Sequence, residues 1–272
     1  MRNRITITIR DEIIKEVDKL INNLTIRNRS HAIEYLLSKM ISNYKVSNAL
    51  VLAGGPSIGF SNQVHKCMQL VKNKPILENI ILSLKDQEIK NFVFACDNMS
   101  NQVTSYFSDG KRFDVDIKYV ISEEPKGRAL SIKMAKDFFD KTFLVWYGDT
   151  LCKFDLTDMI RVHNDNKALA TIALTTVSNP LDFGIVKMRG NRIIDFVEKP
   201  KKRIAESYLV SSGIFLAEPE IFKYINSKMK SLESDLFPKL AKKNLLVGYP
   251  FEGMWLNVNN KNELQKANSL WK

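Results

Sequence analysis

From residue 49 onward, short apolar runs alternate with segments of helical periodicity, and this alternation constrains the fold more than any other feature of the chain. The apolar runs of strand length cover residues 49–53, 92–95, 143–147 and 168–174. The segments with apolar residues at helical spacing cover residues 76–84, 128–139 and 156–163. Strands that alternate with helices predict an α/β fold with a doubly wound, mostly parallel sheet. In such sheets, ligands bind at the carboxyl ends of the strands.

A chain of 272 residues fits two domains. Helical periodicity near the N-terminus ends close to Ile41, and a polar stretch at residues 42–47 precedes the first apolar run. Interdomain linkers are often polar and poor in periodic pattern. We therefore expect a small first domain at residues 1–46 and a larger second domain at residues 47–272.

The composition excludes several classes of protein. The three cysteines, Cys67, Cys96 and Cys152, have no metal-binding spacing, which disfavours a zinc site or a disulfide framework and favours a reducing, cytoplasmic setting. The apolar runs are too short to span a membrane, so no membrane partner is expected. The net charge of +11 favours polyanionic partners but does not select one.

The first ten residues alternate strictly between apolar and polar side chains. Ile5, Ile7 and Ile9 occupy one side of the pattern, and arginine and threonine residues occupy the other. A period of two is typical of a half-buried β-strand. Short donors and guanidinium groups on one face of a two-stranded ribbon are suited to reading base edges in a DNA major groove.

Two helices are expected after this strand. Asp11 stands where a helix N-cap belongs, and apolar residues recur at helical spacing up to Leu24. Asn28 is expected to cap a second helix, whose apolar side extends from Ala32 to Ile41. A module this small buries little surface alone, and an unpaired strand leaves its backbone groups unmatched. We therefore expect two chains to pair their strands in a homodimer or a larger assembly.

Residues 2–44 resemble the ribbon-helix-helix (β-α-α) family of DNA-binding proteins, in the segments "RITITI" and "NRSHAI". The resemblance implies DNA as a partner, with polar strand residues reading bases and the start of the second helix holding a phosphate. The candidate DNA-binding residues are Arg4, Thr6, Thr8, Arg10, Asn28, Arg29 and Ser30. If the polar face only contacts water, the segment is instead a dimerisation arm.

Two strand ends in the second domain carry chemically informative residues. The glycines Gly54 and Gly55 follow the first apolar run, and glycines there let backbone amides approach a nucleotide closely. Asp149 follows the run 143–147, where a carboxylate is able to hold Mg²⁺ together with phosphate oxygens. Taken alone, each feature is also typical of an ordinary tight turn.

The order of many short motifs makes the second domain more specific. The chain contains "LAGG", "NKPIL", "EEPKGRAL", "FLVWYGDT", "DFGIV", "FVEKP", "VSSGIF", "SLESDLFPKL" and "GYPFEGMWLNV" in this order. In this series, residues 48–270 closely resemble the sugar-phosphate nucleotidylyltransferases. These enzymes join a sugar 1-phosphate to a nucleoside triphosphate and release pyrophosphate.

The resemblance implies roles for individual positions of this sequence. The residues expected to bind the nucleotide or sugar are Ala53, Gly54, Gly55, Lys66, Gly127, Gly148, Asp149, Gly184, Glu198, Lys199 and Gly213. Among them, Lys66 is the phosphate-binding lysine, and Glu198 and Lys199 recognise the sugar hydroxyls and the sugar phosphate. Lys66 and Asp149 are the catalytic candidates. Asp149 and Asn257 are the candidate ligands of a weakly held Mg²⁺.

Three positions depart from the family pattern. The family loop G-G-x-G-T-R ends here at Gly59, so its arginine is missing, and the second metal-binding aspartate is replaced by Asn257. The family sequence G-T-A is Gly127-Arg128-Ala129 in this chain. Loss of a charge clamp costs orders of magnitude in rate, because electrostatic stabilisation dominates this chemistry.

These departures favour a regulator over an enzyme. The sequence predicts a DNA-binding transcriptional regulator whose catalytically depleted second domain senses a nucleotide or nucleotide sugar. The alternative is an active sugar-1-phosphate nucleotidylyltransferase with an autoregulatory DNA-binding domain, in which Arg128 or Lys66 supplies the missing charge.

Overall fold

The computed structural model describes residues 5–22, 25–43, 45–55, 60, 64–97, 100–122, 127–201 and 207–272. The chain divides into two compact units, Met1–Lys45 and Val46–Lys272, called the first and second unit below. No helix among the described residues is both long enough and apolar enough to cross a membrane.

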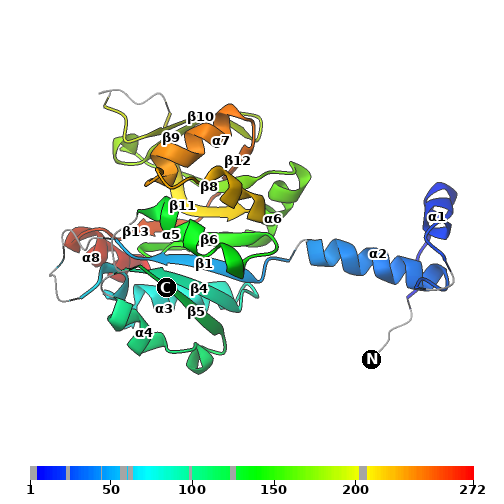
Figure 1. The fold of residues 1–272 in the computed structure, drawn as a ribbon, viewed down its shortest axis with the longest axis horizontal. Coiled ribbons are helices and arrows are strands. Elements are labelled where there is room, and N and C mark those ends of the chain that lie inside the picture. The colour runs from blue at the N-terminus through cyan, green and yellow to red at the C-terminus, as the bar shows by residue number, and fades with distance from the viewer. Residues whose placement is uncertain are drawn as a thin grey trace. The chain divides into compact units, whose positions relative to one another are not determined.

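Two helices make up the described secondary structure of the first unit, α1 (Asp11–Asp18) and α2 (Arg29–Asn43) (Figure 1). Asp11 is the first helical residue, whereas Arg10 occupies the N-cap that was expected at Asp11. The Asn28 side chain accepts a hydrogen bond from the His31 backbone N–H at 2.9 Å, as expected for a residue that caps α2. The buried core of this unit consists of Val17, Ile26 and Ala32.

The strand predicted over the first ten residues is absent from the described part of the chain. Residues 5–10 form no strand, and Ile5 and Ile7 are 77% and 54% exposed. A strand needs a neighbour for its backbone groups, and no described strand pairs with this segment. Thr6, Thr8 and Arg10 are exposed along this segment, and Arg4 lies outside the described residues.

At the start of α2, where the sequence predicted that a DNA phosphate binds, Arg29 instead contacts a carboxylate of the same unit. The Arg29 guanidinium forms a double hydrogen bond with the Asp18 carboxylate, at 2.7 and 2.8 Å. This pair joins α1 to α2. Its hydrogen bonds are the main reason why the pKa of Asp18 lies below its ordinary value. Asn28 and Ser30 are exposed beside it. The arginine charge therefore already has a partner within the unit.

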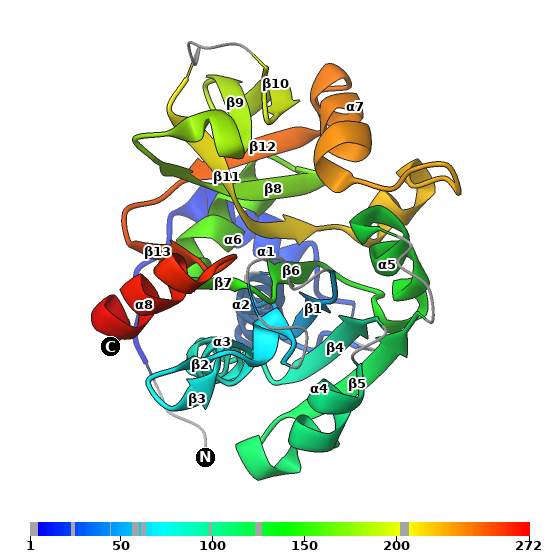
Figure 2. The same cartoon turned by 90° about the vertical axis from the view of Figure 1, so that its left-hand side faces the viewer.

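A nine-stranded sheet forms the centre of the second unit, in the order β5-β4-β1-β6-β11-β8-β12-β10-β9 (Figure 2). Its strands are β1 (Asn48–Ala53), β4 (Asn91–Cys96), β5 (Asp116–Ile121), β6 (Phe143–Tyr147), β8 (Ala170–Thr176), β9 (Gly184–Arg189), β10 (Arg192–Glu198), β11 (Leu209–Ala217) and β12 (Leu246–Pro250). Two small ribbons pair β2 (Leu70–Val71) with β3 (Lys74–Pro75), and β7 (Thr150–Lys153) with β13 (Met254–Asn257).

The helices of this unit lie between or after the strands, as the alternating pattern predicted. They are α3 (Ile76–Lys85), α4 (Ser100–Phe107), α5 (Arg128–Met134), α6 (Leu156–Asp165), α7 (Phe237–Lys242) and α8 (Lys261–Leu270). The helix expected over residues 128–139 is α5 followed by a separate 3-10 turn at Lys136–Phe138. The α/β class is therefore confirmed, and most of the expected elements are present.

Most strands of the sheet share one direction, as predicted, but the sheet is mixed because β10 and β11 run against the others. β5, β4, β1 and β6 run parallel, as do β8 and β12. β11 lies between β6 and β8 and is antiparallel to both, and β10 is antiparallel to β9 and β12. The pattern of apolar runs does not report strand direction, because a buried strand is apolar in either orientation.

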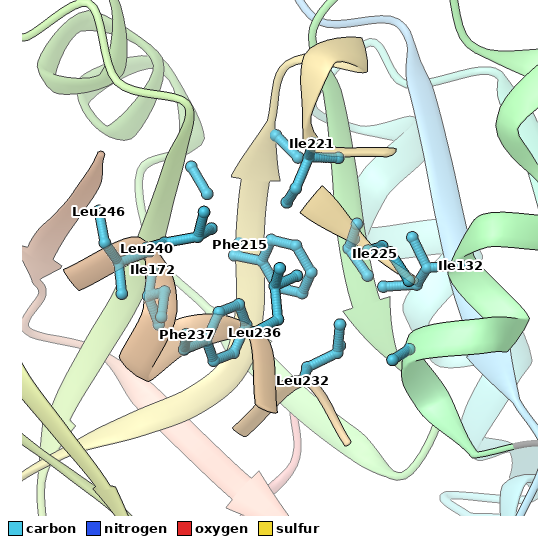
Figure 3. Packing of buried hydrophobic residues seen from close by; sticks show 14 of the residues in the cluster. Ile132, Ile172, Phe215, Ile221, Ile225, Leu232, Leu236, Phe237, Leu240 and Leu246 are labelled. Atoms are coloured by element: carbon cyan, nitrogen blue, oxygen red, sulfur yellow. The ribbon is translucent and has the colours of Figure 1, made fainter. Parts of the chain in front are cut away.

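Both faces of the central strands are buried. Leu50 and Leu52 of β1 belong to a large apolar cluster that also includes residues of α5 and α7. Ala49 and Val51 are equally buried but face the other way, because side chains alternate along a strand. Figure 3 shows Phe215 of β11 in this cluster, surrounded by Leu236, Phe237 and other apolar side chains. Burial on both faces explains why the strands read as continuous apolar runs.

Replacing Phe215 by alanine tests this core. Phe215 is 1% exposed and packs edge-to-face against Phe237 at a centroid distance of 5.3 Å. We expect F215A to lower the free energy of unfolding by roughly 3–5 kcal/mol, because it leaves a cavity in a packed core. Chemical denaturation followed by circular dichroism measures the change. Phe138→Ala, at a side chain that is 39% exposed, is the control and leaves the midpoint nearly unchanged. Equal midpoints for both variants would contradict the assignment of the core.

Candidate functional site

Parallel pairing of β1 with β6 brings two loops together at one edge of the sheet. Leu52 lies opposite Tyr147, and the Gly148 N–H donates to the Leu52 carbonyl at 3.1 Å. The glycines after β1 and Asp149 after β6 therefore lie side by side. Two cavities, of about 340 and 400 Å³, open at this edge. Both are lined by Arg128 and Glu233, so the two cavities adjoin at these side chains.

Backbone and polar groups line the first cavity. Its lining includes Gly54, Gly55, Lys66, Asp97, Ser122 and Gly127. The Gly55 N–H donates to the Asp97 carboxylate in a short hydrogen bond. Gly127 has a φ of +79°, and a Cβ there would come within 2.3 Å of the Lys230 carbonyl oxygen. Only glycine fits this turn, which fixes the start of α5 at the rim of the cavity.

A buried ion pair joins Lys66 to Asp149. The side chains are 9% and 6% exposed, and the Lys66 ammonium donates to Asp149 Oδ2 in a short hydrogen bond. Burial alone would raise the pKa of Asp149, but the nearby Lys66 and Arg128 charges outweigh it and lower the pKa. The pKa of Lys66 is raised because the attraction of Asp149 outweighs burial. Both groups are therefore charged at neutral pH.

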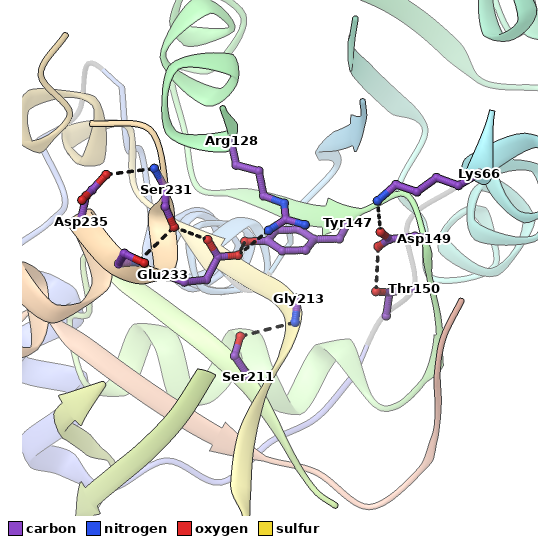
Figure 4. A network of polar contacts seen from close by, with 11 residues as sticks. Lys66, Arg128, Tyr147, Asp149, Thr150, Ser211, Gly213, Ser231, Glu233 and Asp235 are labelled. Atoms are coloured by element: carbon purple, nitrogen blue, oxygen red, sulfur yellow. Dashed lines mark hydrogen bonds and ion pairs between the residues drawn. The ribbon is translucent and has the colours of Figure 1, made fainter. Parts of the chain in front are cut away.

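Arg128, Tyr147 and Glu233 form a second polar cluster (Figure 4). Arg128 Nη1 donates to Glu233 Oε1 at 3.0 Å, and its guanidinium carbon lies 4.5 Å from the centre of the Tyr147 ring. The Tyr147 hydroxyl donates to the same oxygen at 2.7 Å, and the Ser231 hydroxyl donates to Oε2 at 2.8 Å. Burial and the Glu233 charge hold the pKa of Tyr147 well above its ordinary value, so it stays a donor.

The second cavity is lined by carboxylates, amides and glycines. Its residues include Asp149, Gly184, Glu198, Lys199, Gly213 and Asn257. Burial, reinforced by Glu233, raises the pKa of Glu198 to about 6. Gly213 has a φ of +81°, and a Cβ there would lie 2.9 Å from Tyr147 Cδ2. Oriented acceptors with a few cations are typical of a site that binds hydroxyl and phosphate groups.

Asp149 and Asn257, the two metal ligands expected from the sequence, lie at the same cavity. Asn257 pairs with Thr150 across the β7–β13 ribbon, and both Asn257 and Asp149 line the second cavity. The Asn257 Oδ1 atom is buried and has no hydrogen-bond partner in the described part of the chain. Carboxylate and amide oxygens are ligands that Mg²⁺ accepts, and the ion keeps its remaining waters or substrate oxygens. The described residues contain no cluster of three or more acidic, histidine or cysteine side chains that would hold a metal alone.

The structure brings most of the predicted ligand-binding residues together. Gly54, Gly55, Lys66 and Gly127 line the first cavity, and Asp149, Gly184, Glu198, Lys199, Gly213 and Asn257 line the second. Two predicted residues, Ala53 and Gly148, line neither cavity. Ala53 is buried at the end of β1, and Gly148 packs closely against its neighbours. A Cβ on Gly148 would lie 3.0 Å from Cys67 Sγ. Gly59 and its neighbours at residues 56–58 lie outside the described residues.

The sequence did not assign roles to three residues of the site. Asp97 follows β4, and only its position at a strand end signals its place in the cavity. Tyr147 and Glu233 fall within motifs that the sequence contains, but their contact with Arg128 joins distant segments of the chain. Glu233 lies in a π-helical turn, η6 (Leu232–Leu236), a type of turn that often occurs at functional sites.

A protein-family model described as Nucleotidyl transferase matches residues 48–271. The UTP–glucose-1-phosphate uridylyltransferase of Synechocystis sp. is 32% identical over 232 residues, which are 77% of this chain and 59% of that protein. The mannose-1-phosphate guanyltransferase beta-B of Xenopus laevis is 27% identical over 219 residues, or 77% of this chain and 60% of that protein. The chain thus spans about three-fifths of the length of these relatives.

Solved structures share the fold. HddC from Yersinia pseudotuberculosis superposes with a TM-score of 0.72 at 21% identity, covering 84% of this chain and 100% of that one. A UDP-glucose pyrophosphorylase complexed with UDP-glucose superposes with a TM-score of 0.72 at 18% identity, covering 84% of this chain and 98% of that one. At these identities the likeness establishes the fold alone.

These findings overturn the main functional prediction from the sequence. The family match covers nearly the whole second unit, and the relatives are named as sugar-1-phosphate nucleotidylyltransferases. The prediction of a DNA-binding transcriptional regulator with a non-enzymatic sensor domain is therefore wrong. It gave too much weight to the missing arginine in the loop that ends at Gly59 and to the replacement of a metal-binding aspartate by Asn257, although the assembled site contains several other cations.

Replacing Asp149 by asparagine tests the buried ion pair. The change leaves the Lys66 charge without its buried partner, so we expect the free energy of unfolding at neutral pH to fall by roughly 3–5 kcal/mol. Because folding lowers the pKa of Asp149, the wild-type pair contributes at neutral pH, and this contribution is lost as the pH falls through that lowered pKa. Chemical denaturation at several pH values measures both effects.

The exposed pair of Arg161 with Asp158 offers a matched control for D149N. D158N should leave the unfolding midpoint unchanged, because exposed ion pairs contribute little. A D149N protein as stable as the wild type at neutral pH would show that Lys66 does not depend on this carboxylate.

Proposed function

Because the chain belongs to the nucleotidyl transferase family, we propose that it transfers a nucleotidyl group from a nucleoside triphosphate to a sugar 1-phosphate and releases pyrophosphate. The observation that carries the proposal is the pair of adjoining cavities at the carboxyl edge of β1 and β6. Two substrates must meet at one phosphorus atom, and two cavities with a shared wall provide that geometry.

In this proposal the first cavity holds the nucleotide. The backbone amides of Gly54 and Gly55 face the phosphates, and Ala53 fixes the start of the loop at the end of β1. Asp97 accepts from the Gly55 N–H, and a bound phosphate would compete for that donor. Ser122 and Gly127 lie at the same cavity and line the space for the base and ribose.

The second cavity holds the sugar phosphate. Lys199 supplies a cation for its phosphate, and Glu198 accepts hydrogen bonds from sugar hydroxyl groups. Gly184 leaves room beside Glu198, because a Cβ there would come within 3.0 Å of Glu198 Oε2. Gly213 likewise keeps the wall of the cavity open next to the Tyr147 ring.

The reaction needs positioning and charge stabilisation more than proton transfer. A sugar-phosphate oxygen attacks the α-phosphorus of the nucleotide, a new P–O bond forms, and pyrophosphate leaves with the electron pair of the broken P–O bond. Lys66 and Asp149 hold fixed charges beside this point. A Mg²⁺ bound by Asp149 and Asn257 would neutralise phosphate charge when present. Because the Asn257 amide carries no negative charge, we expect the metal to bind more weakly here than between two carboxylates.

The substrates are proposed as a class. The relatives act, by their names, on glucose 1-phosphate with UTP and on mannose 1-phosphate with a guanine nucleotide. A hexose 1-phosphate is therefore the proposed acceptor, and the base is left to the experiment.

Pyrophosphate release tests this function directly. Purified protein is incubated with Mg²⁺ and each of UTP, GTP, dTTP, CTP and ATP, paired in turn with glucose 1-phosphate and mannose 1-phosphate. We expect one pairing to release pyrophosphate, and we expect K199A to raise KM for the sugar phosphate about tenfold or more through loss of a charged contact. Lys243→Ala, at the C-cap of α7 and outside the described lining of both cavities, is the control. No release with any pairing would contradict the proposal.

We further propose that the first unit joins two copies of the chain. Residues 5–9 have no described backbone hydrogen bond, and Ile5 and Ile7 are exposed on one side of the segment. A second copy would pair these backbone groups and bury the isoleucines. The added buried apolar surface would stabilise a unit whose own core is only Val17, Ile26 and Ala32 among the described residues.

Sedimentation of the full chain tests this pairing. We expect a dimer for the wild type and a monomer for the double variant I5D/I7D, because charges on the apolar side oppose burial. Thr6→Asp, on the polar side of the same segment, should remain dimeric. A monomeric wild type, or a dimeric I5D/I7D, would rule out this interface.

A further inference from the structure

We propose that Arg128 is a catalytic residue whose guanidinium binds the phosphoryl oxygens at the junction of the two cavities. The proposal rests on the nucleotidyl transfer proposed above. It assigns to one side chain the positive charge that stabilises the reacting phosphorus centre.

The position of Arg128 among the cations of the site supports this role. Lys66 and Lys230 line the first cavity, and Lys199 lines the second. Arg128 lines both, and within the described lining it is the cation that the two cavities share. The transferred phosphorus must lie where the two substrates meet, so the shared cation is within reach of it, whereas the Lys66 charge nearby is already paired with Asp149. The Arg128 side chain is 46% exposed and therefore accessible to a ligand.

Arg128 also has donors available. A guanidinium carries five N–H donors, and the described contacts of Arg128 use only Nη1, which donates to Glu233. Nε and Nη2 have no partner in the described part of the chain. The Tyr147 ring lies against the guanidinium plane at 4.5 Å and restricts its rotation (Figure 4). A planar cation held on one edge and one face presents its remaining donors in a fixed direction, which suits bidentate phosphate binding.

The local backbone explains how the side chain is held there. Arg128 is the first residue of α5, directly after the left-handed turn at Gly127. The Ala129 N–H donates to the Lys230 carbonyl at 3.2 Å, which ties the start of α5 to the segment preceding η6. Glu233 of η6 then reaches Arg128 from the same side. Two segments about a hundred residues apart in the chain therefore fix one guanidinium.

In the proposed step, the attacking sugar-phosphate oxygen forms a bond to the α-phosphorus while the bond to pyrophosphate breaks. Negative charge accumulates on the non-bridging oxygens of the α-phosphate as the attacking anion approaches. Arg128 donates hydrogen bonds to these oxygens and neutralises that charge. No proton is transferred, and the guanidinium remains protonated throughout, because neighbouring anions raise its pKa further above the physiological range despite burial.

A purely structural role is the competing explanation. In that case Arg128 only neutralises Glu233 and packs on Tyr147, and its removal would lower stability without a specific effect on the chemical step. The two explanations predict different values of kcat for R128A and different responses of that variant to added guanidinium ion. A further comparison is an arginine that has only structural contacts. Arg192 provides that comparison, since it donates to the Asn244 and Asn166 carbonyls and lines neither cavity.

The experiment compares wild type, R128A, R128K and R192A of the full chain under the pairing of substrates that gives turnover. We expect R128A to lower kcat about 100-fold or more, with a smaller change in KM for the sugar phosphate. Guanidinium chloride at a concentration too low to denature should restore part of the R128A rate and leave the wild-type rate unchanged. R192A should lower the thermal midpoint while keeping the wild-type kcat.

The outcomes separate this assignment from the proposed function. Wild-type turnover together with an R128A rate within a few-fold of it overturns the assignment and leaves the proposed function standing. Absence of wild-type turnover overturns both. If R128A does not fold, R128K decides, because lysine keeps the charge without the planar fork. A folded R128K with kcat reduced about tenfold or more supports the assignment, and a wild-type kcat overturns it.

Discussion

Parallel pairing between β1 and β6 is the constraint on which the site depends. It places the glycine loop after β1 next to Asp149 after β6, although about a hundred residues separate them. β11 then pairs antiparallel with β6 and brings Gly213 against Tyr147. The two cavities follow from this arrangement, because each is built from loops at one edge of the same strands.

Ion pairs hold several side chains in position around the two cavities. Lys66 faces Asp149, and Arg128 faces Glu233, so these four charges have partners before a substrate arrives. Such pairs stabilise poorly by themselves but hold their members in fixed positions. Fixed charges around the meeting point of two anionic substrates are what nucleotidyl transfer requires.

The sequence predicted the local elements well and the long-range ones less well. Alternation of apolar runs and helical spacing was sufficient to place β1, β4, β6 and α3. It carried no information on strand direction, so the antiparallel β11 was missed. The sequence also could not predict the contact of Arg128 with Glu233, because the two residues lie far apart in the chain. The motif order located most cavity residues, whereas the functional interpretation failed because it judged the chemistry of the site from a few replaced positions, chiefly the missing arginine near Gly59 and Asn257.

Direct observation of the product tests the central claim most sharply. Phosphorus NMR of the protein with Mg²⁺, a nucleoside triphosphate and a hexose 1-phosphate follows every phosphorus atom in one sample. Nucleotidyl transfer predicts paired resonances of a diphosphate-linked nucleotide sugar, with pyrophosphate appearing at the same rate. Persistent triphosphate and sugar-phosphate resonances for every combination of base and hexose would contradict it.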